Sequence, residues 1–202
     1  MKNGDIIREA LIGNTIRLIG EEGFEKATTR AITTDGLEVP GIRFNEVYIY
    51  RLFGSKEQLY ATAFAELDAE LLTRLQSISQ DTQQLKGTRR EKLCLAFDRM
   101  WRFLLQNEAR CRCYVRYYYS AYFAGEPMRA HRRLFAEYKK LFPGMFRPES
   151  DVVAILHTTF MTMMDFAIRV YNRDLEDTAN TADHIFLLLY TSMTPYLTPE
   201  PN

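Results

Sequence analysis

The segment Tyr50-Arg51-Leu52-Phe53-Gly54-Ser55-Lys56-Glu57-Gln58-Leu59 contains a helix end followed at once by a helix start. Gly54 readily adopts the left-handed backbone conformation that terminates helices. Ser55 with Gln58 three residues later has the pattern of a capping box, in which two side chains satisfy backbone N–H groups at a helix start. The segment therefore predicts a short helix that ends at Phe53 and a new helix that begins at Ser55.

The residues before this segment predict further helices. Apolar residues three and four positions apart indicate a helix from residue 5 to 22, and Gly23 ends it. Thr28 or Thr29 is suited to cap a short second helix, because a threonine oxygen accepts from the N–H groups of a first turn. Two helices therefore precede the segment that opens at Tyr50.

A turn and a third helix follow. Pro40-Gly41 favours a turn, and Asn45 is suited to cap a helix that runs to Phe53. Three short helices with a capped third one are typical of a helix-turn-helix, which presents the start of its third helix to base edges in the major groove. The N-terminal residues 1–54 are therefore predicted to form a DNA-binding domain.

Three stretches resemble the signature of TetR-family repressors: Gly23-Phe24, Ala27-Thr28-Thr29-Arg30-Ala31-Ile32 and the segment from Tyr50 to Leu59. The resemblance covers the first 60 residues. It implies an all-α chain in which the helix-turn-helix is followed by a helical ligand-binding and dimerisation domain, over residues 55–202. The chain departs from the family pattern around Leu37 to Arg43, where an insertion enlarges the turn before the third helix. This enlarged turn affects the tilt of the third helix and so the operator sequence.

The resemblance also implies which side chains contact double-stranded operator DNA. It implies phosphate contacts from Thr29, Tyr50 and Lys56, and base contacts from Asn45, Glu46 and Tyr48. Arg30, and Arg43 from the enlarged turn, are in position to reach the DNA backbone. Each has a plainer interpretation: Tyr50 is partly core, Lys56 an ordinary surface lysine, and Glu46 a residue that complements the helix dipole.

Composition neither supports nor excludes a polyanionic partner. The chain has 26 Lys plus Arg and 26 Asp plus Glu, and residues 1–60 carry eight basic against nine acidic side chains. Any DNA-binding surface must therefore come from where the charges lie. Three cysteines form no disulfide framework, and we expect neither a signal peptide nor a membrane-spanning run. A cytoplasmic protein without membrane contact is expected.

The rest of the chain is predicted to be helical, without strands or repeats. Two long helices, over residues 150–172 and 181–196, finish it. Apolar stripes along both predict a homodimer, and in the family such helices pair with their two-fold mates in a four-helix bundle. The stripes comprise Val153, Leu156, Phe160, Met163, Ala167 and Val170, and then Ile185, Leu188, Leu189, Ser192 and Tyr196. The alternative is that they only fill the core of one protomer.

An aromatic stretch, predicted to be helical from residue 110 to 124, is the candidate effector pocket. Tyrosine rings with buried hydroxyls suit a small aromatic or amphipathic ligand. The candidate effector-binding residues are Tyr114, Tyr117, Tyr118 and Tyr122, joined by Trp101, His157, Met161 and Asp165. For any single one of them, an ordinary place in the core is the alternative.

No enzyme signature accompanies these features. The sequence lacks a Gly-x-Ser-x-Gly element, a phosphate-binding glycine loop and a His-x-x-x-His pair, and Cys111 and Cys113 lie on opposite sides of a helix. We expect no catalysis, no cofactor and no metal. The predicted function is a ligand-responsive transcriptional regulator, a repressor released from palindromic DNA by its effector. The alternative is an all-helical adaptor or small-molecule-binding protein with impaired DNA binding.

Overall fold

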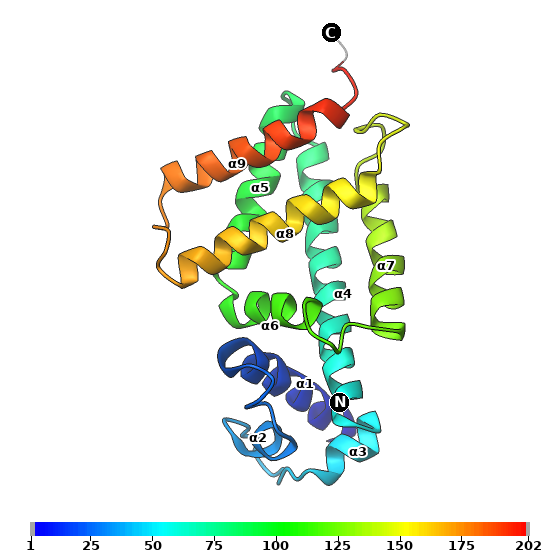
Figure 1. The fold of residues 1–202 in the computed structure, drawn as a ribbon, viewed down its shortest axis with the longest axis vertical. Coiled ribbons are helices and arrows are strands. Elements are labelled where there is room, and N and C mark those ends of the chain that lie inside the picture. Colours follow the sequence, from blue (N-terminus) through cyan, green and yellow to red (C-terminus); the bar gives the residue numbers. More distant parts are fainter. Residues whose placement is uncertain (1–2, 201–202) are drawn as a thin grey trace. The chain divides into compact units, whose positions relative to one another are not determined.

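The computed structural model describes residues 3–200 and is built of helices (Figure 1). Within these residues, extended backbone is limited to two isolated bridges, Val39–Ile42 and Phe146–Leu197. The all-α prediction is confirmed. The helices are α1 (Asn3–Glu22), α2 (Thr29–Thr34), α3 (Val47–Phe53), α4 (Lys56–Gln83), α5 (Arg89–Leu105), α6 (Glu108–Tyr118), α7 (Glu126–Tyr138), α8 (Val152–Tyr171) and α9 (Ala179–Met193), with single 3-10 turns η1 (Lys139–Leu141) and η2 (Thr194–Tyr196).

The chain packs into two compact units. Unit 1 comprises the residues up to Asp68 together with Glu108–Ala130, and unit 2 comprises Ala69–Asn107 and the residues from His131 onward. The long helix α4 therefore contributes its first half to unit 1 and its second half to unit 2. A functional boundary after Gly54 stays a prediction, because packing groups α6 with the N-terminal helices.

Helices α1 to α3 of unit 1 share one core. The side chains of Leu11, Ile19, Ile32 and Ile49 are fully buried in it. Asn14 lies beside them on α1, and its amide donates to the carbonyl of Ile32 at 2.8 Å, which ties α1 to α2. Burial of these apolar side chains supplies most of the stability that such short helices lack by themselves.

Capping fixes the ends of α2 as the sequence predicts. The hydroxyl of Thr28 accepts from the backbone N–H of Ala31 at 3.1 Å, so Thr28 is the N-cap residue. The hydroxyl of Tyr60, from α4, donates to the carbonyl of Ala27 just before this cap. Both ends of the connection between α1 and α2 are therefore held in place.

Helix α6 packs closely on the end of α1. A Cβ atom built on Gly20 would stand 2.0 Å from the carbonyl oxygen of Ala109, so only glycine allows this approach. The Arg116 guanidinium donates to the carbonyls of Ile19 and Gly20 at 2.6 and 3.1 Å. These are carbonyls of the last turn of α1, where the helix carries partial negative charge.

The aromatic stretch ends its helix earlier than predicted. Helix α6 ends at Tyr118, and residues 119–124 form turns in which the N–H of Phe123 donates to the carbonyl of Ser120. The prediction of a helix to Ala124 is therefore wrong. The chain must turn here because Gly125, with φ +61°, precedes α7. Tyr122 consequently folds back, and its ring packs on Phe24 and Tyr60 at 5.0 and 5.3 Å.

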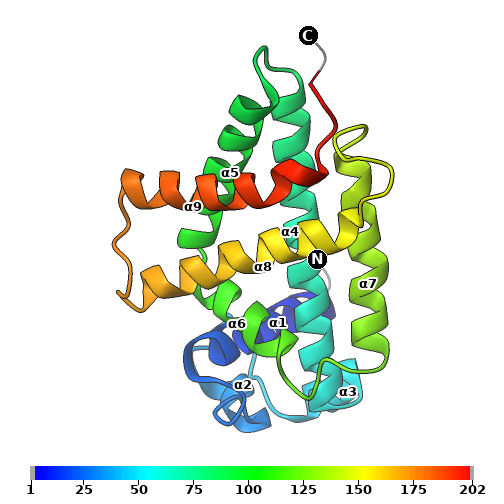
Figure 2. The same ribbon diagram turned by 45° about the horizontal axis from the view of Figure 1, so that its top comes forward.

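In unit 2, α8 and α9 lie side by side in both ribbon views, and both pack on α5 (Figure 2). The hydroxyl of Tyr171 at the end of α8 donates to the carbonyl of Leu104 in α5. Thr88 with Glu91 three residues later has the sequence pattern of a capping box, and the start of α5 forms one. The Thr88 hydroxyl accepts from the N–H of Glu91, and the Glu91 carboxylate accepts from that of Thr88. The long helices of this unit thus enclose a common interior.

Much of the stripe predicted to form a dimer interface instead faces this interior. Five of its members are buried inside the protomer: Phe160, Met163, Ala167, Ile185 and Leu189. Their spacing of three and four matches any buried helix face, whether the neighbour is the same chain or a copy of it. Leu188 and Tyr196 remain exposed on α9 and beyond its end, together with Leu187.

One helix within residues 3–200, α8, is long and apolar enough by composition to cross a membrane, which the sequence analysis did not expect. Such a helix is weak evidence, because core helices of water-soluble proteins pass the same test. Only 28% of its most apolar window is buried inside the protomer. Most of its other residues are half-buried, and the exposed ones are Ala154, Thr158, Asp165 and Arg169.

Candidate nucleic-acid interface and ligand cavity

Helix α3 is anchored on one side and open on the other. Ile49 and Phe53 are buried, whereas Val47 is 66% and Tyr50 55% exposed. Val47 and Tyr50 therefore form an outward face of this seven-residue helix that is accessible to a partner. Gly54, with φ +82°, ends the helix as predicted.

The start of α3 lies one residue later than predicted. The first helical residue is Val47, and Glu46 occupies the N-cap position without a side-chain bond to the helix. Asn45 still serves this turn, because its side-chain oxygen accepts from the N–H of Val47 at 3.1 Å. The N–H groups of Tyr48 and Ile49 donate to the carbonyls of Asn45 and Glu46 at 3.1 and 3.0 Å, so the donors of the first turn are satisfied within the protein.

The enlarged turn before α3 contains a tight reversal at Pro40-Gly41. The N–H of Ile42 donates to the carbonyl of Val39 at 3.0 Å, and Gly41 has φ +76°. Proline followed by a residue of positive φ is the pattern of a type II turn. Arg43 follows directly after this turn and is exposed. The predicted turn is confirmed, and it places a cation next to the start of α3.

All eight predicted DNA-binding residues lie in unit 1, and most are accessible. Arg30, Arg43, Asn45, Glu46 and Tyr50 are exposed, and the others are half-buried. Two contacts order them: the Thr29 hydroxyl donates to the Glu46 carboxylate, and the Arg51 guanidinium lies 4.7 Å from the ring centre of Tyr48. The structure thus brings the phosphate candidate Thr29 together with the base candidate Glu46. Their roles toward DNA stay predictions.

Lys56 opens α4 where the sequence predicts a restart. The Ser55 hydroxyl accepts from the N–H of Gln58 at 3.0 Å, which is the first half of the expected capping box. The ammonium of Lys56 lies 5.6 Å from the ring centre of Tyr60. This contact directs the ammonium without neutralising its charge, so Lys56 keeps the charge that a phosphate contact needs.

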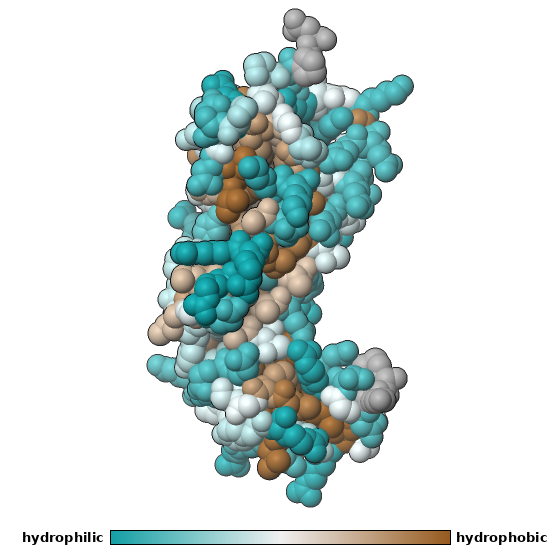
Figure 3. All heavy atoms as spheres, turned by 90° about the vertical axis from the view of Figure 1, so that its right-hand side faces the viewer, coloured by the Kyte–Doolittle hydropathy of each residue, from teal (hydrophilic) through white to brown (hydrophobic). Residues whose placement is uncertain are grey.

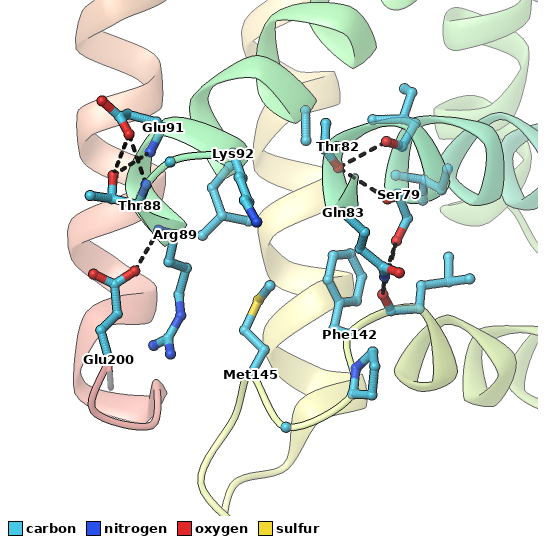
Figure 4. Close-up of a pocket in the computed structure, with 18 residues that line it drawn as sticks. Ser79, Thr82, Gln83, Thr88, Arg89, Glu91, Lys92, Phe142, Met145 and Glu200 are labelled. Carbon is cyan, nitrogen blue, oxygen red and sulfur yellow. Dashed lines mark hydrogen bonds between the residues drawn. The ribbon is translucent and has the colours of Figure 1, made fainter. Parts of the chain in front are cut away.

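Unit 2 contains two adjoining cavities, of about 710 Å³ and about 120 Å³. The larger lies between the end of α4, the start of α5 and the loop after η1 (Figure 4). The smaller lies among α4, α5, α7, α8 and α9. Leu75, Leu93, Ala96, Phe142 and Met145 line both, so the two cavities share a wall.

No model of a protein family matches the sequence, and no curated protein matches it. Solved structures match over nearly the whole chain. A TetR-family transcription regulator from Marinobacter aquaeolei has TM-score 0.72 and 17% identity, covering 96% of this chain and 97% of its own. A protein from Shewanella sp. assigned to the same family has TM-score 0.71 and 14% identity, with 95% and 98% covered. The chain has the fold of TetR-family regulators.

A third structure, from Mesorhizobium loti and assigned to the TetR family, agrees at TM-score 0.70 and 13% identity, with 98% and 100% covered. The TetR fold combines an N-terminal helix-turn-helix with a helical C-terminal domain, as the sequence predicts. At these identities the likeness is one of fold.

Within this TetR fold, the eight predicted effector-binding residues do not gather at one cavity. None of them lines either of the two cavities of unit 2. Four belong to unit 1 and four to unit 2. The four of unit 1 are Tyr114, Tyr117, Tyr118 and Tyr122, and the four of unit 2 are Trp101, His157, Met161 and Asp165.

The tyrosines of unit 1 belong to an aromatic cluster around Phe64. Its ring packs on those of Tyr114 and Tyr117 at 4.9 and 4.6 Å, and the Tyr114 hydroxyl donates to the buried carboxylate of Asp68 at 3.0 Å. Burial raises the pKa of Tyr117 to about 12. Its hydroxyl therefore stays protonated and donates to the carbonyl of Tyr122 at 3.2 Å. The ring of Tyr118 packs on Phe123 at 4.6 Å.

The four candidates of unit 2 have different surroundings. Trp101 is buried and stacks on Phe97 with ring centres 6.0 Å apart, so Phe97 rather than Trp101 reaches the smaller cavity. His157 packs on Phe135 at 5.3 Å, Met161 is half-buried, and exposed Asp165 pairs with Arg169 at 3.0 Å. His157, Met161 and Asp165 are four residues apart, so they share one face of α8. None of the three lines either cavity.

Sequence reasoning missed the residues that do line the cavities. They come from five helices and the loop after η1, and most are ordinary leucines, phenylalanines and methionines. Such residues carry no local signal, because only tertiary packing decides which of them leaves a void. The larger cavity also has polar lining residues, among them the half-buried Lys92 of α5.

Across residues 3–200 there is no group of three or more His, Cys, Asp or Glu side chains that could hold a metal ion. Cys111 and Cys113 are both buried, because α6 is enclosed on two sides. Burial raises the pKa of the Cys113 thiol to about 12. The thiol is therefore protonated and unreactive at neutral pH.

Proposed function

We propose that the protein is a cytoplasmic transcriptional regulator that binds operator DNA through α3 and responds to a small-molecule effector. The observation that carries the proposal is the open face of α3, where Val47 and Tyr50 project from a helix that Ile49 and Phe53 anchor. A short rigid helix of this kind fits the major groove, which admits one α-helix. The exposed side chains of Arg30 and Arg43 supply flanking positive charge.

The regulator acts as a homodimer held by α8 and α9. Two lines of support are the limited burial of α8 within the protomer and the exposure of Leu187 and Leu188 on α9. The space-filling view shows that hydrophobic residues also reach the surface in patches elsewhere (Figure 3). A two-fold pair of helix-turn-helix units reads a palindrome, because its two third helices then enter successive major grooves.

The cavities of unit 2 hold the effector, and the protein is a repressor without catalytic activity or cofactor. Release from DNA requires only that the effector bind more tightly to a conformer that fits the operator poorly. Helix α4 belongs to both units and lines both cavities with Leu75, so it is the element that carries this preference to the DNA-binding end.

The test is selection of DNA by the full-length protein from a library of random duplexes, followed by gel shifts at increasing salt. We expect an enriched palindrome whose affinity falls steeply with salt, because neutralised phosphates release counterions. Lys56→Ala should weaken binding to every sequence alike and reduce the salt slope by about one. Lys86→Ala removes an exposed charge of unit 2 and is the matched control.

A helical adaptor or small-molecule-binding protein with impaired DNA binding is the second candidate. Two observations favour it: the Glu46 carboxylate stands at the start of α3, and it is held there by Thr29. A carboxylate repels nearby phosphates. If no duplex sequence is enriched, or binding does not change with salt, the regulator is excluded and the adaptor remains.

A further inference from the structure

The two cavities of unit 2 have opposite chemistry. Among the residues that line the smaller one, none is charged, and the polar groups are a threonine and two tyrosine hydroxyls. The hydroxyl of that threonine, Thr159, already donates to the carbonyl of Ile155 at 2.8 Å. Such a space cannot solvate an ion, and its size compares with a dry apolar cavity of about 150 Å³ that accepts benzene. It therefore suits hydrocarbon.

The larger cavity is lined by polar groups, and most of them are already engaged. The Ser79 hydroxyl and the Gln83 amide donate to the carbonyl of Leu141 at 2.9 and 3.2 Å. Glu91 accepts from Thr88 in the capping box, and Glu200 accepts from the backbone N–H of Arg89. These carboxylates and donors are therefore occupied within the protein.

The two cations that line this cavity, Arg89 and Lys92, differ in whether their charged groups are already hydrogen-bonded within the protein. The guanidinium of Arg89 donates to the carbonyl and hydroxyl of Thr198. Lys92 is half-buried and projects from α5 toward the Gln83 side of the space (Figure 4). Within the described residues it forms no ion pair and no side-chain hydrogen bond. Of the two cations that line this cavity, Lys92 is therefore the one whose charged group has no hydrogen-bond partner among the described residues.

We infer that the two cavities together bind a negatively charged amphiphile, with its hydrocarbon part in the smaller cavity and its acidic group on the Lys92 ammonium. Ala96 and Met145 line both spaces, so the bound amphiphile must cross from one cavity to the other beside them. A cationic amphiphile fits less well, because both lining carboxylates are engaged. The inference names the chemical class of the effector and rests on the proposed function for its regulatory meaning.

The test is calorimetric titration of the full-length protein with decanoate, decylamine, 1-decanol and butyrate, all below micelle-forming concentrations. We expect one decanoate per protomer and at least about tenfold weaker binding of protonated decylamine, since a charge-assisted hydrogen bond is lost. Butyrate has the acid without the tail and should bind more weakly than decanoate. Equal affinities for decanoate and decylamine, or no decanoate binding, would overturn the inference.

Variants separate the two halves of the cavity. Lys92→Gln should weaken decanoate about tenfold and leave 1-decanol unchanged, whereas Lys139→Gln, at an exposed lysine outside both cavities, should match the wild type. Ala96→Leu should weaken the binding of both decanoate and 1-decanol, because the larger side chain fills space where the two cavities adjoin. If Ala96→Leu lowers the melting temperature, Thr159→Leu is the replacement variant, because it also enlarges a side chain that lines the smaller cavity. Decanoate affinity unchanged in Lys92→Gln would sink the assignment of the acidic group.

The outcome is independent of DNA binding. A protein that binds decanoate but enriches no duplex keeps the ligand inference and loses the proposed regulatory function. A protein that enriches a palindrome but ignores decanoate keeps the proposed function and loses the ligand class. The two experiments therefore fail separately.

Discussion

Single residues at the proposed DNA-binding end of unit 1 are paired with one another in the absence of DNA. Thr29 donates to Glu46, and Arg51 covers the ring of Tyr48. These contacts restrict rotamers that would otherwise have to be ordered on binding, which lowers the entropic cost of recognition. They also mean that neither Thr29 nor Glu46 acts alone, so substitution of one changes the other.

The protonation of His157, on α8, depends on its burial. Burial lowers the pKa of its imidazole, and His131, whose ring centre lies 6.2 Å away, lowers it further. The folded protein therefore binds this proton less readily than the unfolded chain. The stability that His157 contributes as a neutral ring is full above the ordinary histidine pKa, about 6.5, and is lost as the pH falls below it.

We accordingly expect the melting temperature of the wild type to fall between about pH 7 and about pH 5 more steeply than that of His157→Gln. His184→Gln, which changes an exposed histidine, should keep the wild-type slope. Differential scanning fluorimetry across this pH range measures all three proteins. Identical slopes for the wild type and His157→Gln would contradict the assignment.

At the scale of elements, the contact between α1 and α6 is the tightest in unit 1. It depends on the missing side chain of Gly20, on the Arg116 guanidinium and on the burial of Ile19. Helix α6 follows α5 in the chain after two residues, and α5 lines both cavities of unit 2. A change in α5 therefore has a short covalent path to the end of α1.

Two glycines of α1 allow a matched test of this contact. Gly20→Ala should destabilise the protein by about 1–3 kcal/mol, because its Cβ would collide with backbone atoms of Ala109. At Gly13 nothing lies within 4 Å of an added Cβ, so Gly13→Ala should stabilise α1 by up to about 1 kcal/mol. Urea unfolding followed by circular dichroism gives both values. Similar effects of the two substitutions would refute the close packing.

At the scale of the whole molecule, DNA binding and ligand binding are assigned to different units. The helix-turn-helix lies in unit 1 and both cavities lie in unit 2. No described residue belongs to both units, but the long helix α4 divides between them after Asp68. We expect regulation by a ligand to need a second, fixed element, which the proposed homodimer would provide by restricting how two copies of unit 1 are spaced.

The dimer itself is open to a direct test. Leu188 is 53% exposed on α9, and Leu188→Glu should dissociate the dimer, because it would bury an unpaired charge in an apolar interface. Leu85→Glu changes a leucine that is 43% exposed outside α8 and α9, and is the control. Sedimentation velocity should give a monomer for the first variant and a dimer for the second. Two dimers, or a monomeric wild type, would exclude this interface.

Interactions between neighbouring residues account for the features that could be predicted from the sequence. Helix ends follow from short-range hydrogen bonds and glycine conformations, so the caps at Thr28 and Thr88 and the ends at Gly23 and Gly54 were identified from neighbouring residues alone. The all-α fold followed from the same patterns. The end of α6 was misplaced because the aromatic run continues past Tyr118 while the helix does not.

The sequence by itself determined the helices, the turn before α3 and the fold that they build, because these depend on neighbours within a few residues. Only the tertiary structure decided which apolar stripe is core and which is exposed, and where the cavities lie. Phe160 and Leu188 have the same helical spacing signal, yet one is buried and the other is not. The reason is that a void or an open face is defined by side chains from several helices at once, and no single stretch of sequence contains them all.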